Sequence, residues 1–136
     1  MRKLSQQGMT LIELMIVVSI IAILSYVAIG SYGDSSQAAR RTDARSTLLL
    51  TASTLEKCKA VYGTYNNANC SINDGDEIAS AEGLYTIEVD SAATTFTLDA
   101  TPVEGAAQAD DSDCKIIRLN HLGQQTAVGD NTSECW

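Results

Sequence analysis

Twenty consecutive residues without a charged side chain, Leu14 to Gly33, follow directly on an acid, Glu13. At about 1.5 Å per residue, a helix of this length spans roughly 30 Å, the thickness of a bilayer core. The run therefore predicts a membrane-spanning helix. A carboxylate at its start costs about 2.5–3.5 kcal/mol in hydrocarbon, and a partner is the usual reason for keeping one there.

The apolar run contains no Lys or Arg that could be this partner. A cut between Gly8 and Met9 would create an α-ammonium group four residues before Glu13. The carboxylate of one helix could then pair with the terminal amine of a neighbouring helix and fix the axial offset between the two. An ordinary signal peptide, cut near Ala28-Ile29-Gly30, is the alternative, and it leaves Glu13 unexplained.

The helical pattern continues beyond the apolar run to about residue 62, and Gly63 is a natural stop. One face of this half is expected to carry Ala44, Leu48, Ala52, Leu55 and Tyr62.

The two halves of the chain differ in charge. Residues 1–59 hold seven Lys or Arg against four acids, whereas residues 60–136 hold two against thirteen. Three arginines, Arg40, Arg41 and Arg45, follow the apolar run. They are expected to contact lipid headgroups, to meet the acidic domains of neighbouring subunits, or to lie on a solvated helix face.

After Gly83 the apolar residues recur at every second position, which predicts β-strands. Residues 84–90 and 95–101 form a predicted hairpin that ends at Pro102. Further strands are expected at 115–120 and, more weakly, at 124–128. The predicted fold is α+β, with a long N-terminal helix packed on an antiparallel sheet of about four strands.

Four cysteines lie beyond the apolar run, and their even number indicates disulfides formed in an oxidising compartment. Their spacing is poor for zinc. Three pairings are possible. The pairs Cys58–Cys70 and Cys114–Cys135 are favoured because each brackets a local excursion of the chain.

The residues give no sign of catalysis. Asp110, Asp111 and Asp113 raise the question of calcium, but the spacing of an EF-hand is missing, so a solvated acidic loop is favoured. His121 lies in a predicted turn without an identifiable nucleophile beside it, which favours a surface histidine. We therefore predict no catalytic residue, no metal site and no cofactor.

The segment KLSQQG-MTLIEL resembles the class III signal of type IV prepilins. The resemblance implies that residues 1–8 are a leader, that prepilin peptidase cuts after Gly8 and methylates Met9, and that Glu13 directs assembly. It further implies an assembly helix at 9–33 and a head domain at 34–136. Gly30 stands where many relatives have proline, so whether the helix unwinds there in a filament is open.

The later segments GTY, YTIEVDSAATTFTLDATP and SECW are similar to PilE-type minor pilins. The resemblance implies a structural subunit that waits in the bacterial inner membrane and is then assembled into a pilus. Its partners would be other pilin subunits, prepilin peptidase, the assembly machinery and membrane lipid. A major pilin, a secretion-system pseudopilin and a DNA-uptake receptor pilin are the alternatives. DNA lacks support because the head is acidic and only the Arg40–Arg45 cluster is basic.

Overall fold

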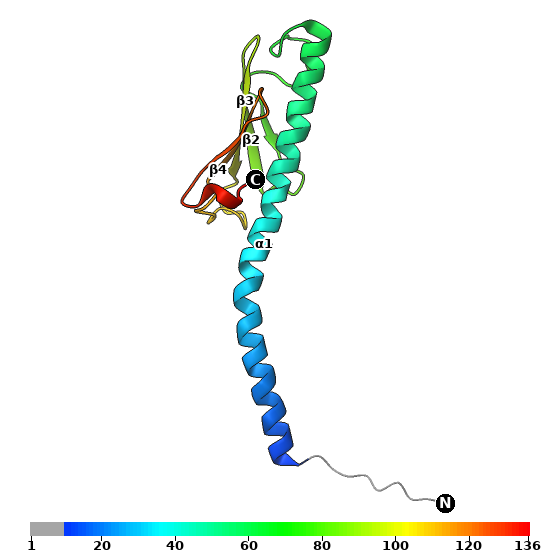
Figure 1. The fold of residues 1–136 in the computed structure, drawn as a ribbon. Coiled ribbons are helices and arrows are strands. Elements are labelled where there is room, and N and C mark those ends of the chain that lie inside the picture. Colours follow the sequence, from blue (N-terminus) through cyan, green and yellow to red (C-terminus); the bar gives the residue numbers. More distant parts are fainter. Residues whose placement is uncertain (1–9) are drawn as a thin grey trace, which may run out of the picture. The chain divides into compact units, whose positions relative to one another are not determined.

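The computed structural model describes residues 10–136, apart from the side chains of residues 27–32 and 34. The chain divides into two compact units, Met1–Ser35 and Ser36–Trp136. Its elements follow one another as α1 (Leu11–Tyr62), β1 (Glu77–Ala79), β2 (Tyr85–Ser91), β3 (Phe96–Pro102), β4 (Ile116–Asn120), β5 (Gln125–Val128) and a short 3-10 helix, η1 (Thr132–Glu134) (Figure 1). The predicted α+β fold is confirmed.

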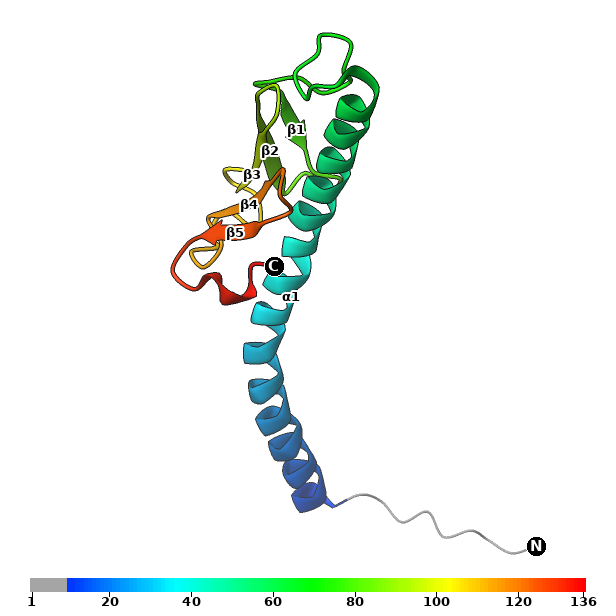
Figure 2. The ribbon, with the colours of Figure 1, turned by 45° about the horizontal axis from the view of Figure 1, so that its top comes forward.

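The sheet of the second unit is an antiparallel meander in the order β1-β2-β3-β4-β5, and it lies against the C-terminal half of α1 (Figure 2). It has five strands rather than about four. The additional strand, β1, covers three residues at the sheet edge and pairs Ile78 with Ile87 of β2. The hairpin β2–β3 and the strands β4 and β5 lie within a residue of their predicted positions.

The core lies between one face of α1 and the inner face of the sheet. The alternating pattern of β2 and β3 sends every second side chain into it, which is why Ile87, Ala100 and Ile117 form one buried row across three strands. From α1 the core receives Ala44, Leu48 and Leu55, with Ala52 partly buried beside them.

The helix ends as predicted, but its last tyrosine is not in the core. Gly63 has a φ of +77° and donates its N–H to the Lys59 carbonyl at 2.8 Å, which ends α1. Tyr62 is 45% exposed. The tyrosine that this end of the helix contributes to the core is instead Tyr65, because the chain reverses after Gly63 and folds back over the sheet.

In the first unit, α1 begins directly after Thr10. The Thr10 hydroxyl accepts the N–H of Glu13 at 3.3 Å, and the Thr10 carbonyl accepts the N–H of Leu14 at 3.2 Å. Thr10 is therefore the N-cap, and the spacing Thr-x-x-Glu is that of a capping box. The backbone of α1 stays helical through Gly30.

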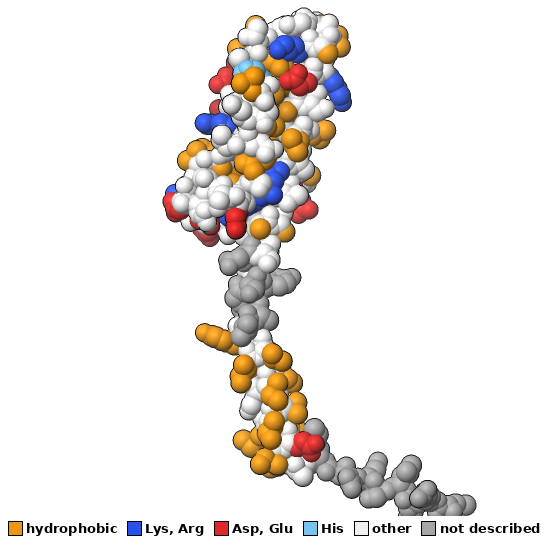
Figure 3. All heavy atoms as spheres, viewed as in Figure 1, with side chains coloured by type: hydrophobic (Ala, Val, Ile, Leu, Met, Phe, Trp, Pro, Cys, Tyr) orange, Lys and Arg blue, Asp and Glu red, His pale blue; other side chains and the backbone are white. Residues whose placement is uncertain are grey.

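The large apolar side chains between Leu11 and Tyr26 are exposed on this unit, where they form the apolar surface in Figure 3. Within the described part of the chain, no helix combines the length and the apolarity needed to cross a membrane.

Candidate functional site

The C-terminal loop is closed by one of the two disulfides. The bonds join Cys114 to Cys135 and Cys58 to Cys70, which are the pairs favoured from the sequence. Each connects Cα atoms 5.6 Å apart. The first links the start of β4 to the last residues of the chain, and the second links the end of α1 to the loop that follows it.

Two arginines of α1 hold the end of the C-terminal loop. Arg45 donates from Nε to the Cys135 carbonyl and from Nη2 to the Glu134 carbonyl, both at 2.9 Å. Arg41 also reaches the Glu134 carbonyl, at 3.4 Å. The helix therefore fixes the backbone of residues 134–135 through cationic donors. For Arg41, which is 3% exposed, this contradicts the expectation of a side chain that faces headgroups, neighbouring subunits or solvent, whereas Arg45 remains partly exposed.

Arg41 also forms a buried ion pair with Asp111. Two parallel hydrogen bonds of 2.8 Å join the groups, and only 3% of Arg41 and 2% of Asp111 are exposed. Asp111 further accepts the side-chain amide of Gln108 at 2.7 Å and the N–H of Cys114 at 3.2 Å. The loop that contains Asp111 is thus anchored in the core, and the prediction of a solvated acidic loop is wrong for this residue.

The electrostatics of this pair agree with its geometry. Burial by itself would raise the pKa of Asp111, but the hydrogen bonds and the charge of Arg41 outweigh burial and lower that pKa below its ordinary value. The hydrogen bond with Asp111 raises the pKa of Arg41. Beside the pair, burial raises the pKa of Tyr85 to about 12, so its phenol stays neutral. Among the described residues, no group of three or more His, Cys, Asp or Glu side chains could hold a metal ion.

Gly129 allows the C-terminal loop to pack closely. A Cβ atom at this position would overlap the backbone carbonyl of Asp113. We expect Gly129→Ala to lower the stability of the head by about 1–3 kcal/mol, because the loop must move to admit one methyl group. Thermal unfolding of the full chain in detergent, followed by near-UV circular dichroism, measures this loss.

Gly83→Asn is the matched control for the Gly129 variant. Gly83 has a φ of +69°, which asparagine tolerates, and no atom lies within 4 Å of a Cβ built there. A Gly129→Ala protein that unfolds at the wild-type temperature would contradict the close packing.

The outer face of the sheet is acidic. Cross-strand pairing aligns Glu77 of β1, Glu88 of β2, Asp99 of β3 and Arg118 of β4 in one row. Arg118 donates to both carboxylate oxygens of Asp99, one of them at 2.6 Å. The one cation of this row is therefore already paired, and the face as a whole would repel a polyanion.

Among the described residues, the cations without a carboxylate partner are all on α1. Seven Lys or Arg residues lie in the described part of the chain, and within it Arg41, Lys115 and Arg118 are the ones that form ion pairs with acids. The remaining four belong to one helix: Arg40, Arg45, Lys57 and Lys59. Arg40 and Arg45 donate to backbone carbonyls and Lys59 lies over the Tyr65 ring, but no acid neutralises these charges through an ion pair within the described residues. This cationic charge is therefore gathered on the helix side of the head.

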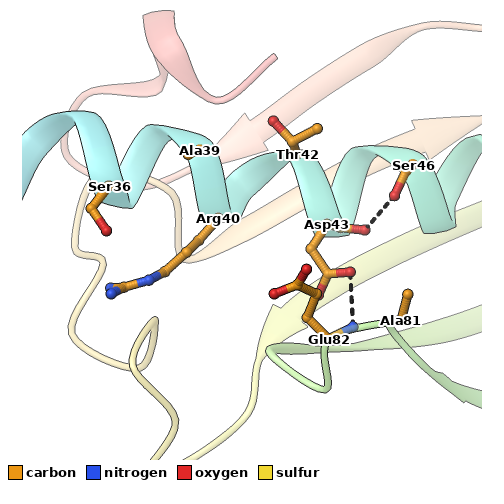
Figure 4. A pocket seen from close by; sticks show the side chains of 8 residues that line it. All are labelled: Ser36, Ala39, Arg40, Thr42, Asp43, Ser46, Ala81 and Glu82. Carbon is orange, nitrogen blue, oxygen red and sulfur yellow. Dashed lines mark hydrogen bonds between the residues drawn. The ribbon is translucent and has the colours of Figure 1, made fainter.

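Arg40 lines an open pocket of about 430 Å³ between α1 and the segment before β2. Its guanidinium contacts the Ala107 carbonyl at 3.3 Å. Figure 4 shows the Arg40 side chain pointing away from two carboxylates at the other end of this pocket, those of Asp43 and Glu82. Because these acids share the pocket, it is a poor place for an anion.

A second groove, of about 320 Å³, separates α1 from the β4–β5 turn. We call it the helix groove. Arg45 lies one turn before Leu49 at one end, and Lys59 lies one turn after Glu56 at the other. Its lining residues are Leu49, Ala52, Ser53 and Glu56 from α1 and Phe96, Leu119, Asn120, His121, Gly123 and Gln125 from the sheet.

Aromatic rings support one end of the helix groove. Tyr65 packs edge-on against Phe96 with ring centroids 5.0 Å apart. Phe96 in turn lies edge-on to His121, with ring centroids 6.3 Å apart. The Lys59 ammonium lies 4.3 Å from the centroid of the Tyr65 ring. The only acid that lines the groove, Glu56, accepts the Tyr65 hydroxyl at 2.7 Å. Burial, and then this hydrogen bond, raise the pKa of Tyr65 to about 12.

The predicted processing residues, Gly8 and Met9, lie outside the described residues. Glu13 lies in the first turn of α1. The roles of Thr10 and Asp111 were not predicted from the sequence. The capping-box spacing could have identified Thr10, whereas nothing near Asp111 in the sequence points to a partner seventy residues away.

Two family profiles match the chain. Residues 3–29 match the prokaryotic N-terminal methylation motif. Residues 30–118 match the family described as type IV minor pilin ComP, DNA uptake sequence receptor. A search of curated proteins found no match. The second profile covers more than half of the chain and the whole of α1 beyond Gly30, together with β1 to β3 and most of the Arg41–Asp111 network. The chain therefore belongs to the family of type IV minor pilins of the ComP type, which are structural subunits and not enzymes.

Proposed function

We propose that the chain is a minor pilin that binds duplex DNA at the surface of a type IV pilus. The description of its family names a DNA uptake sequence receptor, and this supports the alternative of a receptor pilin over a purely structural minor pilin. The separation of charge in the head carries the proposal further, because it removes the objection that an acidic domain repels DNA.

The methylation motif supports a subunit that is first anchored in the membrane and later assembled into a filament. The subunit is first held among the lipids of the bacterial inner membrane. Prepilin peptidase cuts after Gly8 and methylates Met9. The assembly machinery then inserts the subunit into a filament with other pilins, where Glu13 pairs with the amine of a neighbouring chain.

The acidic row of the sheet lies away from the cations of α1. The row Glu77–Glu88–Asp99 lies on the outer face of the sheet, whereas α1 covers the inner face. A duplex that approaches the helix side meets Arg45, Lys57 and Lys59 without crossing the acidic row. Lys57 is exposed.

The spacing of these cations suits a nucleic-acid backbone. Arg45 and Lys59 are about four turns apart and lie on nearly the same side of α1. This separation is about 21 Å along the helix axis, the length of roughly six base pairs. Lys57 lies one turn after Ser53, which lines the helix groove. Two residues rotate a helix by about 200°, so Lys57 and Lys59 lie on nearly opposite sides of the groove-lining face of α1. Phosphate contacts on both sides would fix the position of the duplex over the groove.

The salt dependence of binding tests the proposal. We expect wild-type full chain in detergent to bind a fluorescein-labelled 20-bp duplex of mixed sequence. The logarithm of the binding constant should fall with the logarithm of the salt concentration, with a slope of about 0.9 per phosphate contact. The Lys57→Gln/Lys59→Gln double variant should lower the magnitude of that slope by about two.

Lys115→Gln is the matched control, because Lys115 is an exposed lysine that already pairs with Asp130 at 3.4 Å. Its slope should equal that of the wild type. An unchanged slope in the double variant would exclude α1 as the contact surface. A wild-type chain that binds no duplex at low salt would overturn the proposed function itself.

A further inference from the structure

The β4–β5 turn is held rigid by one side chain. The Asn120 side-chain oxygen accepts the N–H groups of Leu122 and Gln124, each at 3.0 Å, and its amide nitrogen donates to the Gln124 side chain at 2.7 Å. The Gly123 N–H donates to the Asn120 carbonyl at 2.9 Å, and Gly123 has a φ of +72°. A turn with so many of its polar groups paired has little freedom to lose on binding.

This turn presents an apolar side chain to solvent. Leu122 is 68% exposed, although a tight turn usually carries polar residues or glycine. Of the residues that the structure describes beyond α1, Leu122 and Val128 are the large hydrophobic ones that are exposed. A single exposed leucine is ordinary on a protein surface. The position of Leu122, at the tip of a rigid turn, is what distinguishes it.

The turn lies beside α1 in both views of the fold (Figures 1 and 2), and its neighbours His121 and Gly123 line the helix groove. A duplex held by Arg45 and Lys59 would therefore meet the tip of this turn. Proteins that read DNA through its shape commonly insert an apolar side chain, leucine among them, between base steps. Phosphate contacts alone carry no sequence information.

We propose that Leu122 is the residue through which this protein selects DNA sequence, by apolar contact with the bases, and that Asn120 is the positioning residue that holds it out from the turn. The inference rests on the proposed binding of DNA over the helix groove. It adds a division of labour, in which the cations of α1 give affinity for any duplex and Leu122 gives preference for certain base steps.

Selection from a random pool separates the two roles. Full chain in detergent is incubated with 20-bp duplexes of randomised sequence, and the bound fraction is sequenced. The wild type should enrich a motif. Leu122→Ala should bind the same total amount of DNA with the same salt slope. Its preference at one or two adjacent base steps should fall about tenfold. Asn120→Ala should lose the same preference.

Val128→Ala is the control for a lost exposed apolar side chain, and it should enrich the wild-type motif. Thermal unfolding checks that Leu122→Ala is folded. A Leu122→Ala protein that enriches the same motif to the same degree would overturn the inference and leave the proposed binding intact, as would a wild type that binds duplex without any preference. A wild type that retains no duplex would overturn both.

Discussion

Replacing Arg41 by methionine is expected to lower the free energy of unfolding of the head by about 3–5 kcal/mol, because it leaves the Asp111 carboxylate buried without its counter-ion. Asp111 is 2% exposed, so water cannot replace the two lost hydrogen bonds. The loop that contains Asp111 would also lose its anchor on α1. For a head of about this size the loss corresponds to a fall in Tm of more than roughly 12 °C. Thermal unfolding of the full chain in detergent measures it.

Arg118→Met is the matched control. Arg118 also forms paired hydrogen bonds with an aspartate, Asp99, but its side chain is 41% exposed, so its removal should cost less than about 1 kcal/mol. In the double variant Arg41→Met/Asp111→Leu both charges are gone, and part of the lost stability should return. The remainder is the cost of the Gln108 amide and the Cys114 N–H, which lose their acceptor. An Arg41→Met protein within 1 kcal/mol of the wild type would show that the buried pair does not hold the loop.

The parts of the fold that repeat a local pattern are predictable from the sequence. Alternation in residues 84–90 and 95–101 identifies the central hairpin, and Gly63 identifies the end of α1. The strand β1 is missed because three residues at an edge, exposed on both sides of Ile78, are too few to show a period. Tyr62 is exposed because the core position belongs to Tyr65, which the chain reversal after Gly63 supplies.

The candidate site is less predictable, since its charges depend on long-range pairing. A sequence shows that the head is acidic, but not that its acids line the outer face of a sheet while the unpaired cations stay on α1. Arg41 and Asp111 look like two solvated residues until the fold brings them together. Net charge alone is therefore a poor guide to DNA binding, because affinity for phosphate depends on which cations remain unpaired on one surface.

Glu13→Ala is expected to reduce incorporation of the subunit into filaments more than tenfold, because in the proposed pairing the amine of a neighbouring chain then loses its partner in a water-poor setting. Mass spectrometry of filaments sheared from the producing cell measures this through the abundance of the N-terminal peptide that begins at Met9. A methylated peptide at trace level beside a dominant pilin is expected for the wild type. An unaltered level in the Glu13→Ala filaments would contradict charge pairing.

The capping of α1 gives Glu13 a second possible task, which two further variants separate from the first. The Thr10 hydroxyl accepts the Glu13 N–H, and in a capping box the Glu13 side chain accepts the Thr10 N–H in turn. Glu13→Gln keeps a side-chain oxygen that can accept the Thr10 N–H, but it has no charge. The Glu13→Gln protein should therefore fail to assemble, as the Glu13→Ala protein does. Thr10→Ala keeps the charge and loses the hydroxyl cap, at about 1 kcal/mol, and should assemble only a few-fold less well. If Glu13→Gln instead assembled normally and Thr10→Ala did not, the acid would serve the start of its own helix rather than the neighbouring chain.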